Sequence, residues 1–569
     1  MKIQATKNTI FVFQMNIKSF SFFAVLLLFG QLTAQNSKDT STNRVMVIGL
    51  KYQPILIDAY KIESVPVINK PTPQSPNYTY QIPSKQVETP KIVNPIPAAD
   101  FFKKETFEYP SSYVKLGYGN YKTPLAELYF NNKKDEKYSY GAHYKFLQTN
   151  SHLNKGFADF TDHNAKAYLR TYSRVGELGM ELSFNQNDYN FFGFNDTLDL
   201  TRNDLKRRIK NFDALAYFNS TPNSKNKVKH RSSFNFNQFQ IDQVSETNYA
   251  VKSNIYSSIS NFNDLQNGVL SAQLGLNYMT TKLDTSNTFK RLFIQVDPRF
   301  DFVYDDLKFS VGFNSTIFFN GNDTAQPFIN PVIKVTYPLI KDVANLFGGI
   351  DGRYHQQSVR NLINTNPFVN RYDLTNTFDN VRLYAGISAK VGSSADALFE
   401  INYTDISNMP LFVTRYDSVP RLNAFTTIFR QVNIVKFSGA FNYSFSEKFR
   451  IGVLGNFYNY SVNREAAAWQ MPDVDAKVNL KMNIKNKIYP HLDFVAMGSQ
   501  QQRTGLTEAT KTDSKIDAFY DLSAGIDFKF KKKISLFVQA NNIMSTRYQR
   551  WYNYQVLGFN LIGGLTMLF

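Results

Sequence analysis

The chain of 569 residues contains no cysteine. This absence excludes disulfides, thiolate metal sites, cysteine nucleophiles and lipid attachment at an N-terminal cysteine. Tryptophan is scarce, with 2 residues, so 34 tyrosines and 51 phenylalanines supply nearly all of the aromatic content. Beyond the N-terminal segment, the sequence has no run of about eighteen apolar residues that would span a bilayer as a helix. The composition is compatible with two architectures, which are several soluble domains or one large barrel of aromatic-rich strands.

Recognisable catalytic and metal-binding motifs are also missing. The sequence has no Walker-type loop, no His-Glu-x-x-His and no Gly-x-Ser-x-Gly. Its 6 histidines are scattered, and only His152 and His163 fall in one expected loop, beside Asp162. The sequence therefore predicts a protein that is not an enzyme and that has no metal site and no cofactor.

The formal net charge is +18, from 64 basic and 46 acidic residues. A basic chain raises the question of nucleic-acid binding. Here the basic residues are spread over turns and polar strand faces, without basic runs inside a recognisable nucleic-acid module. Loops near anionic lipid headgroups and a hydrated interior account for the charge, so we expect no nucleic-acid partner.

The N-terminus reads as an export signal. Lys18 precedes a short apolar run, Phe20 to Gly30, and Ala34 provides a small residue at the exit. This pattern predicts a secretory signal peptide over residues 1–34, cleaved after Ala34, with Met15 as an alternative start. The alternative is an uncleaved membrane anchor, for which the apolar run is short.

Residues 35–110 differ in texture from the remainder, because they hold many of the prolines and only short apolar patches. Proline interrupts both helices and strand ladders, so we expect an extended periplasmic lead. Val45-Met46-Val47-Ile48 is the candidate partner-binding patch, since such a patch can add a strand to the edge of a partner's sheet. A segment packed into the mouth of a barrel is the alternative.

From residue 111 onward the sequence alternates between apolar and polar residues with a period of two. This is the pattern of strands that have one lipid-facing and one hydrated face. A charged side chain that faces hydrocarbon costs about 2–4 kcal/mol near the bilayer midplane, so the charges must point into the lumen. The candidate lumen-lining residues are Arg382, Lys390, Lys436, Asp521, Asp527 and Lys529.

The pattern predicts an all-β fold, a transmembrane antiparallel up-and-down β-barrel of about 22 strands over residues 111–569. Short polar turns are expected at Asn132 to Lys137, Arg174 to Glu177, Asp305-Asp306, Ile340 to Val343, Gly392 to Ser394, Ser446 to Lys448 and Lys531 to Lys533. Longer loops are expected at Gln148 to Asp162, Phe191 to Arg208, Gln357 to Phe378, Ser407 to Thr427, Asn463 to Val474, Gln501 to Lys515 and Asn542 to Asn553. Short periplasmic turns and long extracellular loops are the layout of outer-membrane barrels.

The C-terminal strand is apolar at every second position from Leu557 and ends on Phe569. Together with Ile534 to Tyr548 and the aromatic run Trp551 to Tyr554, it resembles the end of TonB-dependent receptors, with Met544 where phenylalanine is usual. The resemblance implies a large barrel filled by an N-terminal plug, uptake energised from the inner membrane, and Phe569 as the barrel-assembly signal. We expect Trp551 to Tyr554 to form part of an aromatic girdle at the membrane interface.

The sequence departs from this family at its N-terminus, where residues 35–110 are too short and too proline-rich for a full plug and contain no clear TonB box. A barrel of this width without a plug would enclose a wide aqueous hole. The lead, inward-folded loops or another protein must therefore fill it.

These observations favour an integral outer-membrane barrel that acts as a receptor or conduit for an unidentified substrate. The alternative is a non-transport subunit or scaffold of an outer-membrane assembly, and an outer-membrane hydrolase is a third reading. The expected partners are outer-membrane lipids, the barrel-assembly machinery during insertion, and a lipoprotein or periplasmic protein.

Overall fold

A computed structural model describes twelve stretches of the chain, which are residues 112–132, 137–153, 156–193, 201–221, 228–259, 266–284, 287–321, 325–392, 394–415, 423–446, 448–505 and 512–569. The expected signal peptide, the lead and the patch Val45 to Ile48 lie outside these residues and remain predictions.

The described residues form a closed antiparallel barrel of 22 strands, as the sequence predicts. Closure occurs where β1 pairs with both β2 and β29, so that the first and last strands of the barrel are neighbours. A closed barrel leaves no sheet edge, and every backbone group in lipid can be paired, which a bilayer requires of any spanning structure.

The first half of the barrel wall consists of β1 (Ser112–Gly119), β2 (Thr123–Asn131), β3 (Tyr138–Thr149), β6 (Phe160–Tyr172), β7 (Gly176–Asn190), β8 (Lys206–Ser220), β9 (Val228–Ile241), β10 (Val244–Ile259), β11 (Gln266–Lys282), β12 (Thr288–Tyr304) and β13 (Leu307–Asn320). The second half consists of β14 (Gln326–Ile340), β15 (Ala344–His355), β17 (Thr377–Val391), β18 (Ala395–Arg415), β19 (Ala424–Ser446), β20 (Phe449–Val462), β21 (Val474–Met482), β22 (Ile488–Met497), β25 (Phe519–Lys531), β26 (Ile534–Asn541) and β29 (Asn560–Leu568).

The remaining elements lie in the connections. They are β4 (His152–Leu153), β5 (Gly156–Phe157), α2 (Arg202–Leu205), α3 (Val359–Thr365), β16 (Val369–Arg371), β23 (Gln500–Thr504), β24 (Thr512–Ile516), β27 (Gln549–Trp551) and β28 (Tyr554–Gln555). No helix among the described residues is long and apolar enough to cross a bilayer.

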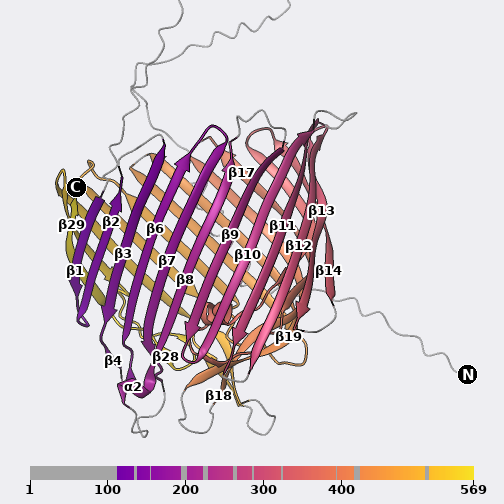
Figure 1. The fold of residues 1–569 in the computed structure, drawn as a ribbon. Helices are drawn as coiled ribbons and strands as arrows, with labels where there is room; N and C mark the ends of the chain where they lie inside the picture. The colour runs from indigo at the N-terminus through magenta and orange to yellow at the C-terminus, as the bar shows by residue number, and fades with distance from the viewer. Residues whose placement is uncertain are drawn as a thin grey trace, which may run out of the picture. The chain divides into compact units, whose positions relative to one another are not determined.

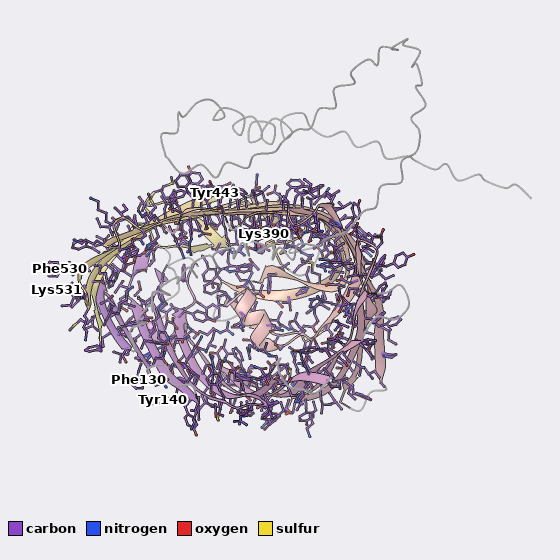
Figure 2. The ribbon with its side chains drawn as sticks, turned by 90° about the horizontal axis from the view of Figure 1, so that it is seen from above. Phe130, Tyr140, Lys390, Tyr443, Phe530 and Lys531 are labelled. Atoms are coloured by element: carbon purple, nitrogen blue, oxygen red, sulfur yellow. The ribbon has the colours of Figure 1, made fainter. Side chains whose placement is uncertain are left out.

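The two faces of the barrel wall differ in chemistry. Large apolar side chains are exposed along the outside, among them Phe130, Tyr140 and Phe530. Figure 2 shows these rings outside the circle of strands, whereas Lys390 lies on its inner side. Alternation along each strand produces this arrangement, because neighbouring residues point to opposite faces. An outer surface of this kind is stable in lipid and would be a large exposed apolar patch in water.

The two ends of the barrel also differ (Figure 1). At the turn end, where β1 begins and β29 ends, most connections are short. At the loop end, the lower end of Figure 1, lie α2, β28 and the far ends of β18 and β19. Two expected loops are wrong in detail. The connection at Ser407 to Thr427 is mostly strand, because β18 and β19 extend beyond the wall, and Gln501 to Lys515 contains most of the hairpin of β23 and β24.

Candidate functional site

The loop end of the lumen contains an inserted segment, residues 356–376, which connects β15 to β17. Helix α3 lies inside the ring of strands in Figure 2. Ser358 forms the N-cap, and its hydroxyl oxygen accepts a hydrogen bond from the backbone N–H of Asn361 at 3.0 Å. A cap of this kind starts a helix by satisfying one of its free N–H groups.

The inserted segment is held by an apolar core, here named the mouth cluster. Val359, Leu362, Ile363 and Val369 of the segment are almost completely buried. Their neighbours come from β9, β10, β18, β19 and the loops around them, and are Phe191, Phe192, Leu205, Phe239, Ile241, Val244, Phe412, Ala424, Phe425, Trp551 and Tyr554. Each side chain buried in this way stabilises the docked segment by about 1.5–3 kcal/mol.

Arg207 of β8 is the principal polar contact of the inserted segment. Its side chain is 2% exposed. The guanidinium donates to the carbonyl oxygens of Pro367 at 3.0 Å and Val369 at 2.5 Å, to the hydroxyl of Tyr372, and to the carboxylate of Asp242 at 2.9 Å. Burial raises the pKa of Tyr372 to about 12, so this hydroxyl stays neutral. One arginine therefore fixes the backbone of the segment to the barrel wall.

A second pair of charged residues holds the start of the segment. Glu246 of β10 accepts a hydrogen bond from the backbone N–H of Val359, the first residue of α3, at 3.0 Å. Arg291 of β12 donates to the carbonyl oxygen of Gln357 at 2.7 Å. A carboxylate next to free N–H groups at a helix start is favourable because of the helix dipole. Both side chains are buried, so each charge depends on these contacts.

At the loop end of the barrel, a small sheet joins three loops, with its strands in the order β16–β19–β18–β23–β24. β16 pairs with β19 in parallel through Val369 and Phe425, and β23 pairs with β18 through Thr414 and Thr504. The inserted segment and the hairpin of β23 and β24 are thereby attached to the same pair of long strands.

Glu465, in the loop between β20 and β21, anchors a further part of the mouth. Its carboxylate accepts hydrogen bonds from Arg430 at 2.8 Å, Arg503 at 2.7 Å and the indole N–H of Trp469 at 2.9 Å. Burial acts to raise the pKa of Glu465, but the donors from Trp469, Arg503 and Arg430 outweigh it and hold the pKa below its ordinary value. The carboxylate is therefore ionised at neutral pH, and it attaches this loop to Arg430 of β19 and Arg503 of β23.

The candidate lumen-lining residues lie on the strand faces opposite the exposed apolar side chains. Arg382 donates to both carboxylate oxygens of Asp351, at 2.8 and 2.7 Å. Lys436 lies 5.4 Å from the ring centroid of Tyr458. Asp521 accepts a hydrogen bond from the hydroxyl of Tyr548 at 2.7 Å.

The three other candidates make fewer contacts. Lys390 and Lys529 are exposed, and Asp527 lines a cavity at the seam of the barrel. The structure does not bring the six candidates together into one site.

The aromatic run Trp551 to Tyr554 is not an interface girdle, so this expectation is wrong. Trp551 and Tyr554 are buried in the mouth cluster, and the ring of Tyr554 stacks on that of Phe368 with centroids 3.4 Å apart. The sequence alone does not separate the two environments, because clustered aromatic residues occur both at membrane interfaces and in buried cores. Among the described residues, no group of three or more histidine, aspartate or glutamate side chains is placed to hold a metal ion.

The fold and the mouth together define the class of protein, a membrane-spanning barrel of 22 strands with an inserted segment of the same chain packed at its loop end. Solved structures of three receptors share the barrel. They are the ferric-catecholate import receptor Fiu from E. coli K12 (TM-score 0.61, 8% identity, 81% of this chain and 82% of that chain), the pyoverdine receptor FpvA from Pseudomonas aeruginosa PAO1 (0.62, 10%, 81% and 79%) and the FrpB iron transporter from Neisseria meningitidis (0.64, 8%, 81% and 82%).

The sequence matches no protein-family model, and no curated protein is significantly similar to it. The structural likeness shows that the chain has the barrel fold of TonB-dependent receptors, which are outer-membrane proteins. It confirms the predicted barrel architecture.

Proposed function

We propose that the protein is an outer-membrane receptor or conduit for a small polar substrate, with a mouth that its own inserted segment keeps closed. The single observation that carries this proposal is the 22-stranded barrel with α3 and the mouth cluster packed at its loop end. A barrel of this width can enclose a path for a substrate, because barrels of about 16–18 strands already leave an aqueous channel.

The contacts of the inserted segment support closure that can be reversed. The segment is held by side-chain contacts and by one short parallel strand pair, and no long ladder ties it to the wall. The barrel strands, in contrast, are paired along most of their length. The segment is therefore the part of the mouth that can leave without opening the barrel.

Two of the neighbours with this fold are named as a ferric-catecholate import receptor and an iron transporter. We infer transport rather than catalysis for this chain, with lumen-lining Arg382, Lys390, Lys436, Asp521, Asp527 and Lys529 forming its polar path. Phe569, whose backbone N–H donates to the carbonyl oxygen of Ser112 at 2.9 Å, is proposed as the barrel-assembly signal. Val45-Met46-Val47-Ile48 is proposed to engage a lipoprotein or periplasmic partner.

Conductance in a planar bilayer tests the proposal. The purified wild-type chain should give little current, and a variant in which residues 358–372 are replaced by a glycine-serine linker of equal length should give stable steps of ion current. If that variant stays folded, as judged by heat-modifiable migration, and remains silent, the conduit reading fails and the scaffold reading is favoured.

A further inference from the structure

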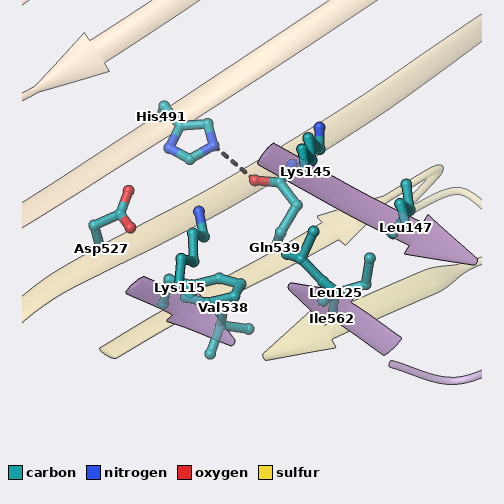
Figure 3. Close-up of a pocket in the computed structure, with 10 residues that line it drawn as sticks. Lys115, Leu125, Lys145, Leu147, His491, Asp527, Val538, Gln539 and Ile562 are labelled. Atoms are coloured by element: carbon teal, nitrogen blue, oxygen red, sulfur yellow. Dashed lines mark hydrogen bonds between the residues drawn. The ribbon is translucent and has the colours of Figure 1, made fainter. Parts of the chain in front are cut away.

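A separate cavity lies at the seam where the barrel closes, away from the mouth cluster (Figure 3). Its volume is about 160 Å³. The polar groups that line it are Lys115 of β1, Lys145 of β3, His491 of β22 and Asp527 of β25, and Gln539 accepts a hydrogen bond from His491 at 2.8 Å. A cavity of this size holds a small molecule, since a single water needs only about 10–15 Å³.

The curvature of the wall creates the cavity. β3 and β22 are separated by five strands around the ring, yet Lys145 and His491 line the same space. In Figure 2 the ring bends sharply at its left end, where β29 meets β1, so side chains from both flanks approach each other there.

Three glycines in the barrel wall leave room for the side chains that line the cavity. A Cβ atom at Gly117 would lie 2.8 Å from the ring of Phe537, and one at Gly564 would lie 2.6 Å from the same ring. A Cβ atom at Gly525 would lie 2.4 Å from the imidazole of His491. Because these positions lack a side chain, Phe537 and His491 lie flat against the wall and leave space beside them.

The lining of the cavity contains two lysines and one aspartate. Lys115 lies 4.1 Å from the ring centroid of Phe537, and in the described part of the chain neither Lys115 nor Lys145 forms a salt bridge. The carboxylate of Glu127, which is paired across the strands with both Lys115 and Lys145, offsets part of their charge and is hydrogen-bonded to Tyr113 at 2.7 Å and His143 at 2.8 Å. Asp527 is the one acidic residue in the lining.

We propose that this cavity is a binding site for a small organic anion, a carboxylate or a phosphate ester. The two ammonium groups supply donors for the anionic oxygens, because charge-assisted hydrogen bonds are the strongest that a protein offers. His491 borders them, with its Nε2–H donated to Gln539. The apolar side chains of Leu125, Leu147 and Ile562 cover the rest of the lining and fit the carbon part of the molecule.

Among the described residues, the lining of the cavity contains no residue of the inserted segment. Lys115, His491 and Phe537 are each the fourth residue of a strand that starts at the turn end of the barrel. The inserted segment is therefore not part of this site, and the binding test is separate from the conductance test above.

Calorimetric titration of the full chain in a non-ionic detergent at low ionic strength tests the proposal. The probes are inorganic phosphate and benzoate, which stand for the two possible sources of the anion. We expect the wild type to bind at least one of them, with an affinity at least tenfold lower in Lys115→Gln and in Lys145→Gln, because each variant removes a charge-assisted contact. Lys334→Gln is the matched control and should bind as the wild type does, because the ammonium of Lys334 lies 5.6 Å from the ring centroid of Phe347 and does not line the cavity.

Asp527→Asn tests whether the affinity for anions changes in the opposite direction when a negative charge is removed from the lining. Removing this carboxylate should strengthen anion binding several-fold, because it takes away the one repulsive charge in the lining. Absence of binding of both probes to the wild type, unchanged affinity in both folded lysine variants, or weaker binding in Asp527→Asn would each overturn the proposal.

Discussion

Arg207→Ala is the substitution that best separates the inserted segment from the barrel. The alanine keeps the strand β8 intact, because the backbone pairing of residue 207 does not involve its side chain. It removes every hydrogen bond from the guanidinium to Pro367, Val369 and Tyr372. It also removes the contact of the guanidinium with the ring of Phe191, whose centroid is 5.1 Å away.

The size of the effect follows from burial. Removing one partner of a buried charged contact costs about 3–5 kcal/mol, since the remaining groups stay buried without their donor. Each 1.4 kcal/mol changes an equilibrium constant tenfold, so the docked state should lose roughly two to three and a half orders of magnitude in population relative to the open state. Apolar burial still favours docking, but ordering the backbone costs about 1–2 kcal/mol per residue, so the net docking energy is small and the loss is decisive.

Limited proteolysis and conductance measure the outcome. We expect Arg207→Ala to be cleaved within residues 356–376 far faster than the wild type and to pass current in a bilayer. Arg208→Ala is the matched control, because Arg208 pairs with Asp188 on the wall, at 2.8 and 2.7 Å, with no hydrogen bond to the segment. If Arg207→Ala is folded but as resistant and as silent as the wild type, the role assigned to Arg207 is refuted.

Three further predictions concern other parts of the chain. In a Trp551→Phe background, the fluorescence of Trp469 should stay constant from neutral pH down to the ordinary carboxyl pKa of 4.5 and change below it. The reason is that the pKa of Glu465 is lowered, so its carboxylate stabilises the loop only while it is ionised. A transition near pH 6 would contradict this. Gly564→Ala should reduce the folded, heat-modifiable fraction, because its Cβ atom would lie 2.0 Å from the carbonyl oxygen of Leu116. Gly439→Ala is the control and should fold as the wild type does, because its Cβ atom would meet nothing within 4 Å. Equal folding of the two variants would argue against a requirement for glycine at position 564. Deletion of Ser41 to Pro95 should leave an inserted, heat-modifiable barrel, and failure to insert would mean that the lead belongs to the folded core.

The barrel was predictable because its signal is local. Along β17, Leu383 and Ile387 face outward and Arg382 faces the lumen, and this alternation is present in the sequence itself. A charged side chain of either sign is destabilising where it faces hydrocarbon. The positions that point into the lumen can therefore be predicted from the sequence without knowing which strands pair. The strand count follows in turn from the spacing of the turns.

The mouth was not predictable from the sequence, because its contacts connect distant residues. Arg207 and the carbonyl of Pro367 are 160 residues apart, and Glu246 and the N–H of Val359 are 113 apart. Nothing in the local pattern marks Arg207, since it falls in an expected loop beside a second arginine. The burial of Trp551 and Tyr554 has the same origin, as their environment is set by residues from other loops.

The absence of cysteine allows the most direct test of the two-faced wall, by labelling single-cysteine variants in proteoliposomes with a membrane-impermeant maleimide. Lys390→Cys, Lys436→Cys and Lys529→Cys should react, because those positions face the wet interior. Leu383→Cys, Phe437→Cys and Ile526→Cys should not, because those positions face lipid. The reverse pattern, or equal labelling of both sets in folded protein, would contradict the account.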